Sequence, residues 1–225
     1  MNKINFKIHK AGWVYLIFFG ILSILFYPFF TLISVFFLII TIFTIVFFRD
    51  PVRVIPKEDF VISPADGLIT YIGKTKAPKE LKLDDEFLKI SIFLNVFNVH
   101  VNRLPVDGKI SKVIYIPGKF FNASLDKASI HNEKNIILIE NNKSEKIIVT
   151  QIAGLIARRI ICDLTEEQNV KKGNKFGIIQ FGSRVDLYLP LHYSPLVSIG
   201  QTVLGGETII SNPRMIKKIE NSILI

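Results

Sequence analysis

The sequence predicts a mainly β protein, in which a compact β-sandwich or barrel-sandwich-like domain follows an N-terminal hydrophobic α-helical hairpin. Two observations lead to this fold class. No charged residue occurs between Ala11 and Phe48. The rest of the 225-residue chain consists of short apolar runs, rich in β-branched and aromatic residues and separated by Gly, Asn, Asp and Lys. Runs of this kind are typical of the strands of all-β domains.

The charge-free stretch predicts two helices. A single helix of this length would be far longer than a hydrocarbon core of about 30 Å. Pro28 lies near its middle, so we expect one helix over residues 12–27 and another over 29–48. Signal peptides are shorter and end at a small-residue cleavage site, and a pair buried in a soluble protein should show a polar face. The sequence therefore favours a membrane hairpin, either fully crossing or re-entrant.

Basic residues flank this stretch on both outer sides. They are Lys3, Lys7 and Lys10 before it, and Arg49, Arg53 and Lys57 after it. By the positive-inside rule, both flanks are expected at the cytoplasmic face of the cell membrane. The formal net charge of +9 adds attraction to anionic lipid. We expect no nucleic-acid partner.

Changes in composition predict the domain boundaries. We expect the hairpin over residues 1–48, a charged, proline-containing linker over 49–60, a β domain over 61–212 and a tail over 213–225. The segment "LTEEQNVKKG" is expected to form a short exposed turn or helix. Cys162 is the only cysteine, which excludes an intrachain disulfide and fits a reducing compartment.

Three polar residues in the β-rich part could carry chemistry. Ser183 follows Gly182 in "QFGSRVDLYLP", where a strand pattern is interrupted; Asp66 lies in "SPADG" and His100 in "FNVHVNRLP". A serine, a histidine and an aspartate can act as nucleophile, base and orienting group on any fold. The ordinary alternatives are a turn serine or a bulge, a turn aspartate and a core histidine.

Four segments in this order, "SPADG", "FLNVFNVHVNRLPVDGKI", "AGLIARRI" and "GIIQFGSRVDLYLP", resemble the phosphatidylserine decarboxylases, and most closely their short form. The resemblance implies self-cleavage between Gly182 and Ser183, which gives associated chains 1–182 and 183–225. We expect this cut to lie between two strands of one sheet. Ser183 would become a pyruvoyl group that forms a Schiff base with phosphatidylserine in the bilayer, and phosphatidylethanolamine would be released. No metal and no diffusible cofactor is implied.

The same resemblance assigns roles to further residues. Asp66 matches the aspartate of the self-processing triad, and His100 matches a catalytic histidine. Arg103 occupies the position of a second histidine in the longer bacterial form, so His100 could serve processing, decarboxylation or both. Arg103 could bind the carboxylate or phosphate of the substrate, or could be a solvated surface residue.

Two other functions stay open at this point. One is a pyruvoyl decarboxylase of another seryl lipid, such as an archaetidylserine-type lipid. The other is a non-enzymatic, membrane-anchored barrel-sandwich adaptor, which would stay as one chain. A further homo-oligomer of the cleaved heterodimer is neither predicted nor excluded.

Overall fold

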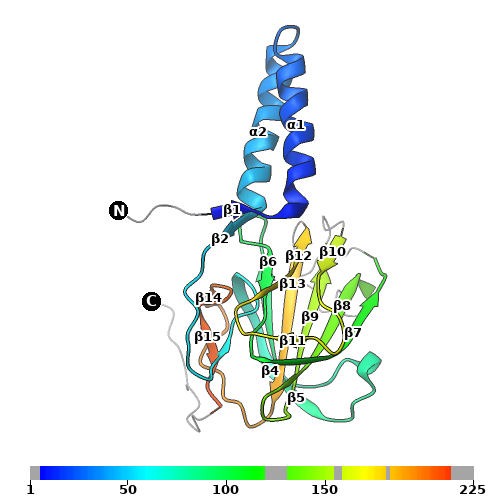
Figure 1. The fold of residues 1–225 in the computed structure, drawn as a ribbon, viewed down its shortest axis with the longest axis vertical. Helices are drawn as coiled ribbons and strands as arrows, with labels where there is room; N and C mark the ends of the chain where they lie inside the picture. Colours follow the sequence, from blue (N-terminus) through cyan, green and yellow to red (C-terminus); the bar gives the residue numbers. More distant parts are fainter. Residues whose placement is uncertain (1–5, 120–130, 155–158, 181–182, 214–225) are drawn as a thin grey trace. The chain divides into compact units, whose positions relative to one another are not determined.

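The computed structural model describes residues 6–119, 131–154, 159–180 and 183–213. The chain divides into two compact units, Met1–Val52 and Arg53–Ile225. Figure 1 shows a helical pair in the first unit and a strongly curled sheet in the second. The predicted combination of a mainly β fold with an N-terminal helical hairpin is confirmed.

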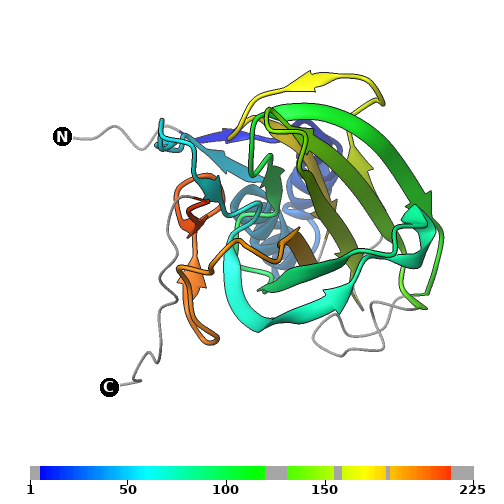
Figure 2. The same cartoon turned by 90° about the horizontal axis from the view of Figure 1, so that it is seen from below.

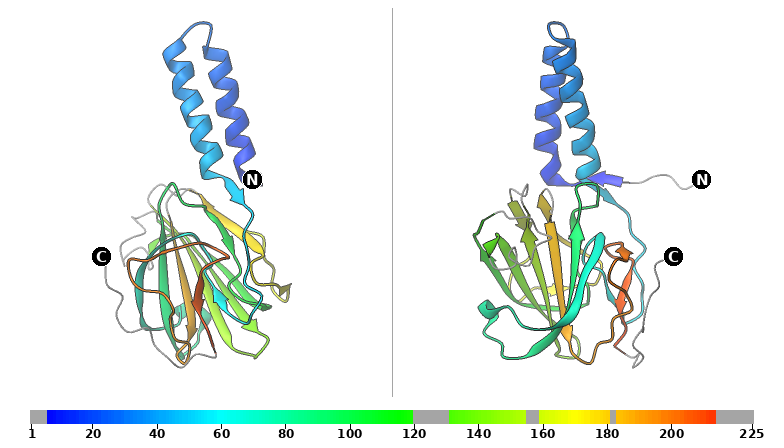
Figure 3. Two further views of the ribbon diagram at one scale, coloured as in Figure 1. Left: turned by 90° about the vertical axis from the view of Figure 1, so that its left-hand side faces the viewer. Right: turned by 180° about the vertical axis from the view of Figure 1, so that it is seen from behind.

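The first unit is a helical hairpin closed by a short β-ribbon. Its elements are β1 (Phe6–Ile8), the 3₁₀ turn η1 (Lys10–Gly12), α1 (Trp13–Phe26), α2 (Thr31–Phe47) and β2 (Arg49–Pro51). β1 and β2 pair antiparallel, and α1 and α2 lie side by side (Figure 3). α1 ends before Pro28 and α2 begins after it, as the fixed φ and the missing N–H of proline predict.

Two serines link the helices of this hairpin. The Ser23 hydroxyl donates to the Ser34 carbonyl at 3.0 Å, and the Ser34 hydroxyl donates to the Ser23 carbonyl at 2.7 Å. This reciprocal pair satisfies both hydroxyls where the side chains are buried. In the described part of the chain, no helix combines the length and the apolarity that crossing a membrane requires.

The second unit is built from antiparallel strands. They are β3 (Val61–Ile62), β4 (Gly67–Lys76), β5 (Glu86–Leu94), β6 (Val101–Arg103), β7 (Gly108–Ile116), β8 (Lys134–Asn141), β9 (Lys146–Ala153), β10 (Arg159–Cys162), β11 (Asn169–Val170), β12 (Lys175–Gln180), β13 (Ser183–Pro190), β14 (Thr202–Val203) and β15 (Ile209–Ser211). A 3₁₀ turn, η2 (Lys79–Leu81), lies between β4 and β5. The segment expected as a turn or helix forms turns and β11.

Eight strands form the curled sheet in the order β11-β7-β8-β9-β13-β5-β4-β14, and Figure 2 shows the curl from the end of the strands. A second sheet has the order β10-β12-β6, and β15 pairs with β3. The largest apolar cluster lies on one face of β13 and includes Val185, Leu187 and Leu189. Tyr188 lies on the other face, in a smaller cluster with Ala77 and Leu81 of the β4–β5 connection. Both faces of β13 are therefore buried.

The strand break before Ser183 differs from our expectation. β12 belongs to the three-stranded sheet, whereas β13 belongs to the eight-stranded sheet, so the prediction that one sheet contains both strands is wrong. Ser183 and Arg184 do not form a turn but are the first two residues of β13. The interruption in the sequence pattern therefore marks a change of sheet.

A cluster of hydrogen-bonded polar side chains links the β8–β9 hairpin to the chain segment after β13. Glu145 accepts hydrogen bonds from the Tyr193 hydroxyl at 2.6 Å and the Asn141 amide at 2.7 Å, and its carboxylate lies 2.9 Å from His192 Nε2. Burial raises the pKa of Glu145, but these hydrogen bonds outweigh it and leave the pKa below its usual value. The ionised form is therefore favoured in the folded chain.

We expect this cluster to make stability depend on pH. A carboxyl group whose folded pKa is lowered stabilises the fold above its unfolded pKa, and that contribution is lost as the pH falls through the folded pKa. The melting temperature should therefore fall on acidification from about pH 5, and less steeply in Glu145→Gln. Thermal melting at a series of pH values measures this; equal slopes for both proteins would contradict it.

Candidate active site

Ser183 is held in the middle of the curled sheet. It pairs with Leu94 of β5 on one side and Ala153 of β9 on the other. Its side chain is 0% exposed, and its hydroxyl has no hydrogen-bond partner within the described residues. An unsatisfied buried polar group costs about 1–3 kcal/mol, so a native protein needs a reason to keep one. Gly182 lies outside the described residues.

The strand beside Ser183 is fixed by side-chain and backbone hydrogen bonds. The Asn132 amide donates to the Ala153 carbonyl at 2.6 Å, and the Ala153 N–H donates to the Glu133 carbonyl at 2.9 Å. Glu133 in turn accepts from the Ile160 N–H through its carboxylate at 3.0 Å. Ala153, the residue opposite Ser183, is therefore anchored to the strands around it, which holds the Ser183 backbone in one orientation.

His100 lies at the end of β12 from which the chain continues to Ser183. β6 and β12 are antiparallel with Val101 opposite Ile178, and His100 directly precedes Val101. The imidazole is 0% exposed, and its Nδ1 lies 2.9 Å from the Asn98 carbonyl. A carbonyl can only accept, so Nδ1 carries the proton and, in the neutral ring, Nε2 carries the lone pair. That tautomer is the one a general base needs.

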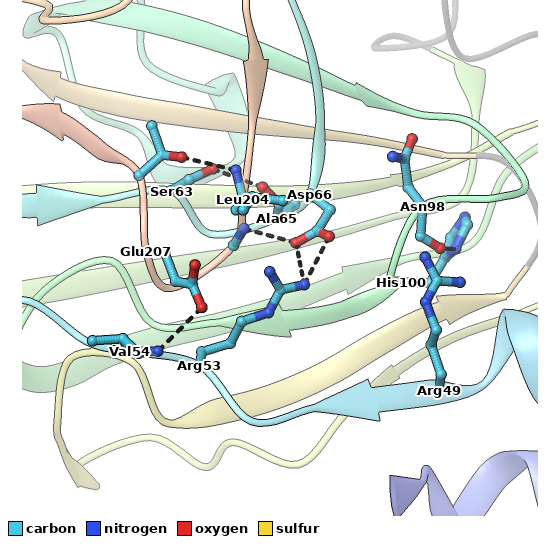
Figure 4. A network of polar contacts seen from close by, with 12 residues as sticks. Arg49, Arg53, Val54, Ser63, Ala65, Asp66, Asn98, His100, Leu204 and Glu207 are labelled. Atoms are coloured by element: carbon cyan, nitrogen blue, oxygen red, sulfur yellow. Dashed lines mark hydrogen bonds and ion pairs between the residues drawn. The ribbon is translucent and has the colours of Figure 1, made fainter. Parts of the chain in front are cut away.

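Asp66 is ion-paired in a turn between β3 and β4 (Figure 4). Arg53 Nη2 donates to both carboxylate oxygens, at 3.0 and 2.8 Å, and the Gly205 N–H donates to Oδ1 at 2.7 Å. Both side chains of the pair are less than a tenth exposed. The next residue must be glycine, because Gly67 has φ +153° and a Cβ there would lie 2.2 Å from the Phe93 carbonyl oxygen.

Arg103 is a buried residue, so the alternative of a solvated surface arginine is wrong. Its side chain packs on Gly206, its Nη1 donates to the Gly173 carbonyl at 3.0 Å, and its backbone N–H donates to the Pro64 carbonyl at 2.9 Å. Pro64 lies in the turn that carries Asp66, and Gly206 follows the glycine that donates to Asp66. Arg103 and Asp66 are thus held around one glycine pair.

Comparison with known proteins decides the family. A family model described as phosphatidylserine decarboxylase matches residues 40–211, which is more than half of the chain. The chain belongs to the phosphatidylserine decarboxylase family. Proteins named phosphatidylserine decarboxylase proenzyme from Rickettsia typhi and Rickettsia prowazekii are each 53% identical over 207 residues, covering 91% of this chain and 90% of theirs. The protein of that name from Rickettsia akari is 54% identical over the same shares. The predicted carboxy-lyase class is confirmed with the family.

Within this phosphatidylserine decarboxylase, the predicted site residues fall into two groups. Asp66 and Arg103 lie around the glycine pair, whereas His100 directly precedes the strand that pairs with β12, and Ser183 begins β13. Asp66 accepts hydrogen bonds from Arg53 and Gly205, and within the described residues none joins it to His100 or Ser183.

Sequence reasoning missed Arg53. It treated this residue as one of the basic flanks of the hydrophobic stretch, whereas the guanidinium is buried against Asp66. No local spacing signals this pair, because it joins a linker residue to a turn thirteen residues later. Arg53 therefore contributes to the interior of the decarboxylase domain.

Arg53→Ala should be strongly destabilising. It leaves the Asp66 carboxylate buried without its cation, which typically costs about 3–5 kcal/mol. We expect a clear loss in melting temperature and slower self-processing. Adding Asp66→Asn removes the uncompensated charge and should restore part of the stability. Lys57→Ala, an exposed change in the same linker, is the matched control. Equal melting temperatures for Arg53→Ala and the control would show that the pair is not structurally important.

Proposed function

We propose that this chain decarboxylates phosphatidylserine to phosphatidylethanolamine through a pyruvoyl group made from Ser183. Family membership supports the reaction, and the buried, unsatisfied Ser183 hydroxyl at the start of β13 supports the residue. The comparisons do not favour the archaetidylserine-type enzyme or the non-enzymatic adaptor. The relatives are named as proenzymes, in keeping with a chain that must be processed before it acts.

Self-processing needs a nucleophile, a base and an oxyanion donor. Ser183 Oγ attacks the carbonyl carbon of Gly182, the new C–O bond forms, and the C–N bond breaks as the nitrogen takes a proton. Elimination of the resulting ester releases the Gly182 carboxylate and leaves a dehydroalanine at position 183. Water then replaces its nitrogen, ammonia leaves, and the pyruvoyl group remains.

His100 is proposed as the base for this step. Its Nδ1–H is engaged by the Asn98 carbonyl, which leaves the lone pair of the neutral ring on Nε2. Asp66 is proposed as a positioning residue and not as the base, because its carboxylate already accepts from Arg53 and Gly205. It would act by fixing the glycine pair on which Arg103 packs.

The pyruvoyl group supplies an electron sink for loss of carbon dioxide from the amine-bearing carbon. The position of Ser183 supports such a group, because the residue is buried and its hydroxyl has no hydrogen-bond partner within the described residues. Arg103 is the proposed contact for the substrate carboxylate or phosphate, since a guanidinium can bind either in a bidentate manner. No metal or diffusible cofactor is required in this scheme.

Phosphatidylserine lies in a bilayer, and an enzyme of phospholipid biosynthesis must work at that surface. We propose that the hairpin of residues 1–48 holds the enzyme at the cytoplasmic face of the cell membrane. Its apolar side chains are widely exposed on both helices, including Leu32 and Ile24. Basic residues near the surface add about 1 kcal/mol each of attraction to anionic lipid.

Removal of Met1–Phe48 tests the anchor. The truncated protein keeps Arg53, so it should still self-cleave, yet it should lose most of its activity on vesicles because it no longer concentrates at the lipid surface. Co-sedimentation with phosphatidylserine vesicles and release of carbon dioxide measure the two effects. A truncated protein that cannot process would show that the hairpin is needed for folding, and one with full vesicle activity would rule out the anchor.

Intact mass spectrometry together with a carbon dioxide assay tests the function itself. Freshly purified protein should contain chains 1–182 and 183–225 without a covalent link, and it should release carbon dioxide from phosphatidylserine vesicles. Native mass measurement then gives the number of heterodimers per particle. Active protein that consists only of the uncut 225-residue chain would refute the pyruvoyl scheme, and a single inactive chain would return the adaptor to consideration.

A further inference from the structure

A cavity of about 390 Å³ lies on the side of the curled sheet that faces away from the Ser183 side chain. Successive residues of a strand point to opposite faces, so Ser183 and Asp186 of β13 lie on different sides of the sheet. Asp186 and Thr150 of β9 line the cavity, and Lys79 and Glu80 of η2 line it from the β4–β5 connection. The cavity is therefore separate from the candidate active site.

The lining of this cavity has a surplus of positive charge. Its charged side chains are those of Lys76, Lys79, Lys89, Lys134, Glu80 and Asp186. Both acids are already paired: Glu80 with Lys134 at 2.8 Å, and Asp186 with Arg184 at 2.9 Å. The ion pair with Arg184 is reinforced by a second contact, from Nη2 to Oδ2 at 3.1 Å.

In the described part of the chain, the charges of three lining lysines are not balanced by an ion pair. Within the described residues, Lys76, Lys79 and Lys89 have no ion pair with a carboxylate. The Lys89 ammonium lies 4.6 Å from the centre of the Tyr71 ring, a contact that leaves its charge uncompensated. A cavity with this balance of charge selects an anion.

Thr150 provides an independent sign of a ligand. It is only 3% exposed, and its hydroxyl has no hydrogen-bond partner among the described residues. Its cross-strand neighbours, Asp186 and Ile136, line the same cavity, so the three share one face of the sheet. A buried hydroxyl without a partner is costly, and a ligand that accepts a hydrogen bond would satisfy it.

We propose that this cavity is a binding site for a phosphate-bearing anion. Lysine ammonium groups bind phosphate as point charges, and the Thr150 hydroxyl supplies a directed donor. The volume lies within the range of small-molecule sites. Asp186 does not oppose the anion, because Arg184 balances its charge. The phosphoryl group could belong to free phosphate or to a lipid headgroup, and the site does not depend on the function assigned to Ser183.

Titration calorimetry on the full-length protein in a maltoside detergent, which contains no phosphate, tests the proposal. The probes are inorganic phosphate and glycerophosphoglycerol, a soluble phosphodiester that matches a lipid headgroup and lacks the seryl group of the substrate. Thr150→Val should weaken binding of the preferred probe by about 10- to 100-fold, the loss of one hydrogen bond to a charged group. Thr150→Ser should keep the affinity. Combined Lys76→Gln and Lys89→Gln should weaken binding further and reduce its dependence on salt.

Lys112→Gln is the matched control, because Lys112 is exposed on β7 and does not line the cavity. Tighter binding of inorganic phosphate identifies a free phosphate ligand, and tighter binding of the diester identifies a lipid headgroup. Binding of neither probe, or equal binding by all variants with unchanged melting temperatures, overturns the proposal. Processing and carbon dioxide release by the same wild-type sample report separately on the proposed function.

Discussion

Ser183→Ala should yield a single uncut chain without decarboxylase activity. Without the hydroxyl no ester can form, and without the ester no pyruvoyl group arises. The substitution should not impair folding, because the hydroxyl it removes is buried and has no partner among the described residues. Deleting an unsatisfied polar atom is neutral or stabilising. We therefore expect the mass of the intact 225-residue chain. The melting temperature of this variant should be no lower than that of the wild-type chain before it is cut.

Ser183→Cys is the informative companion to this variant. A thiol can attack the same carbonyl, and elimination would leave the same unbranched carbon skeleton, so slower cutting with some recovered activity is expected. Intact mass spectrometry and carbon dioxide release measure both variants. Two fragments from Ser183→Ala, cut at the Gly182–Ser183 bond, would rule out the serine hydroxyl as the nucleophile.

His100→Asn should block or greatly slow self-cleavage. Asparagine can keep an N–H for the Asn98 carbonyl, but it lacks the basic Nε2 that is proposed to take the hydroxyl proton. Loss of a general base typically costs about 10²- to 10⁴-fold in rate. The time course of the 43-residue fragment, chain 183–225, measures this rate on a gel.

The same variant separates the two roles that the sequence leaves open. Accumulation of uncut chain assigns His100 to processing, which we favour because, by the resemblance, Arg103 stands where the longer bacterial form has its second histidine. Normal cutting with loss of carbon dioxide release assigns it to decarboxylation. Added imidazole should restore part of the lost rate in either case. Full processing and full activity in His100→Asn would leave His100 as a core residue only.

The features that were predicted correctly depend on local patterns. Apolar runs with turn residues between them predicted the strands, and Pro28 predicted the interruption between the helices. The strands on both sides of Gly182-Ser183 were predicted from their composition, whereas self-cleavage there stays a prediction. Each of these signals lies within a few residues of the element it describes, which is why one sequence was enough.

The features that were missed depend on contacts between distant segments. The assignment of β12 and β13 to different sheets follows from pairing with β6, β9 and β5, and no pattern in "QFGSRVDLYLP" contains that information. The Arg53–Asp66 pair joins a linker to a turn, and Arg103 is buried by the later Gly206. Composition placed Arg53 in a flank and left a surface position open for Arg103, because it does not show which chain segment covers a residue.

The position of residues 183–213 has a consequence for refolding. β13 lies between β9 and β5, β14 pairs with β4, and β15 pairs with β3, so this short part of the chain contributes strands to two sheets. In the uncut protein these strands reach their places as one tethered molecule. Once the chain is cut, the same pairings would require an encounter between two separate molecules, at an effective concentration that the tether no longer supplies. A mature enzyme that unfolds would therefore not regain its structure as readily as its precursor. The proposed scheme therefore requires folding to precede scission.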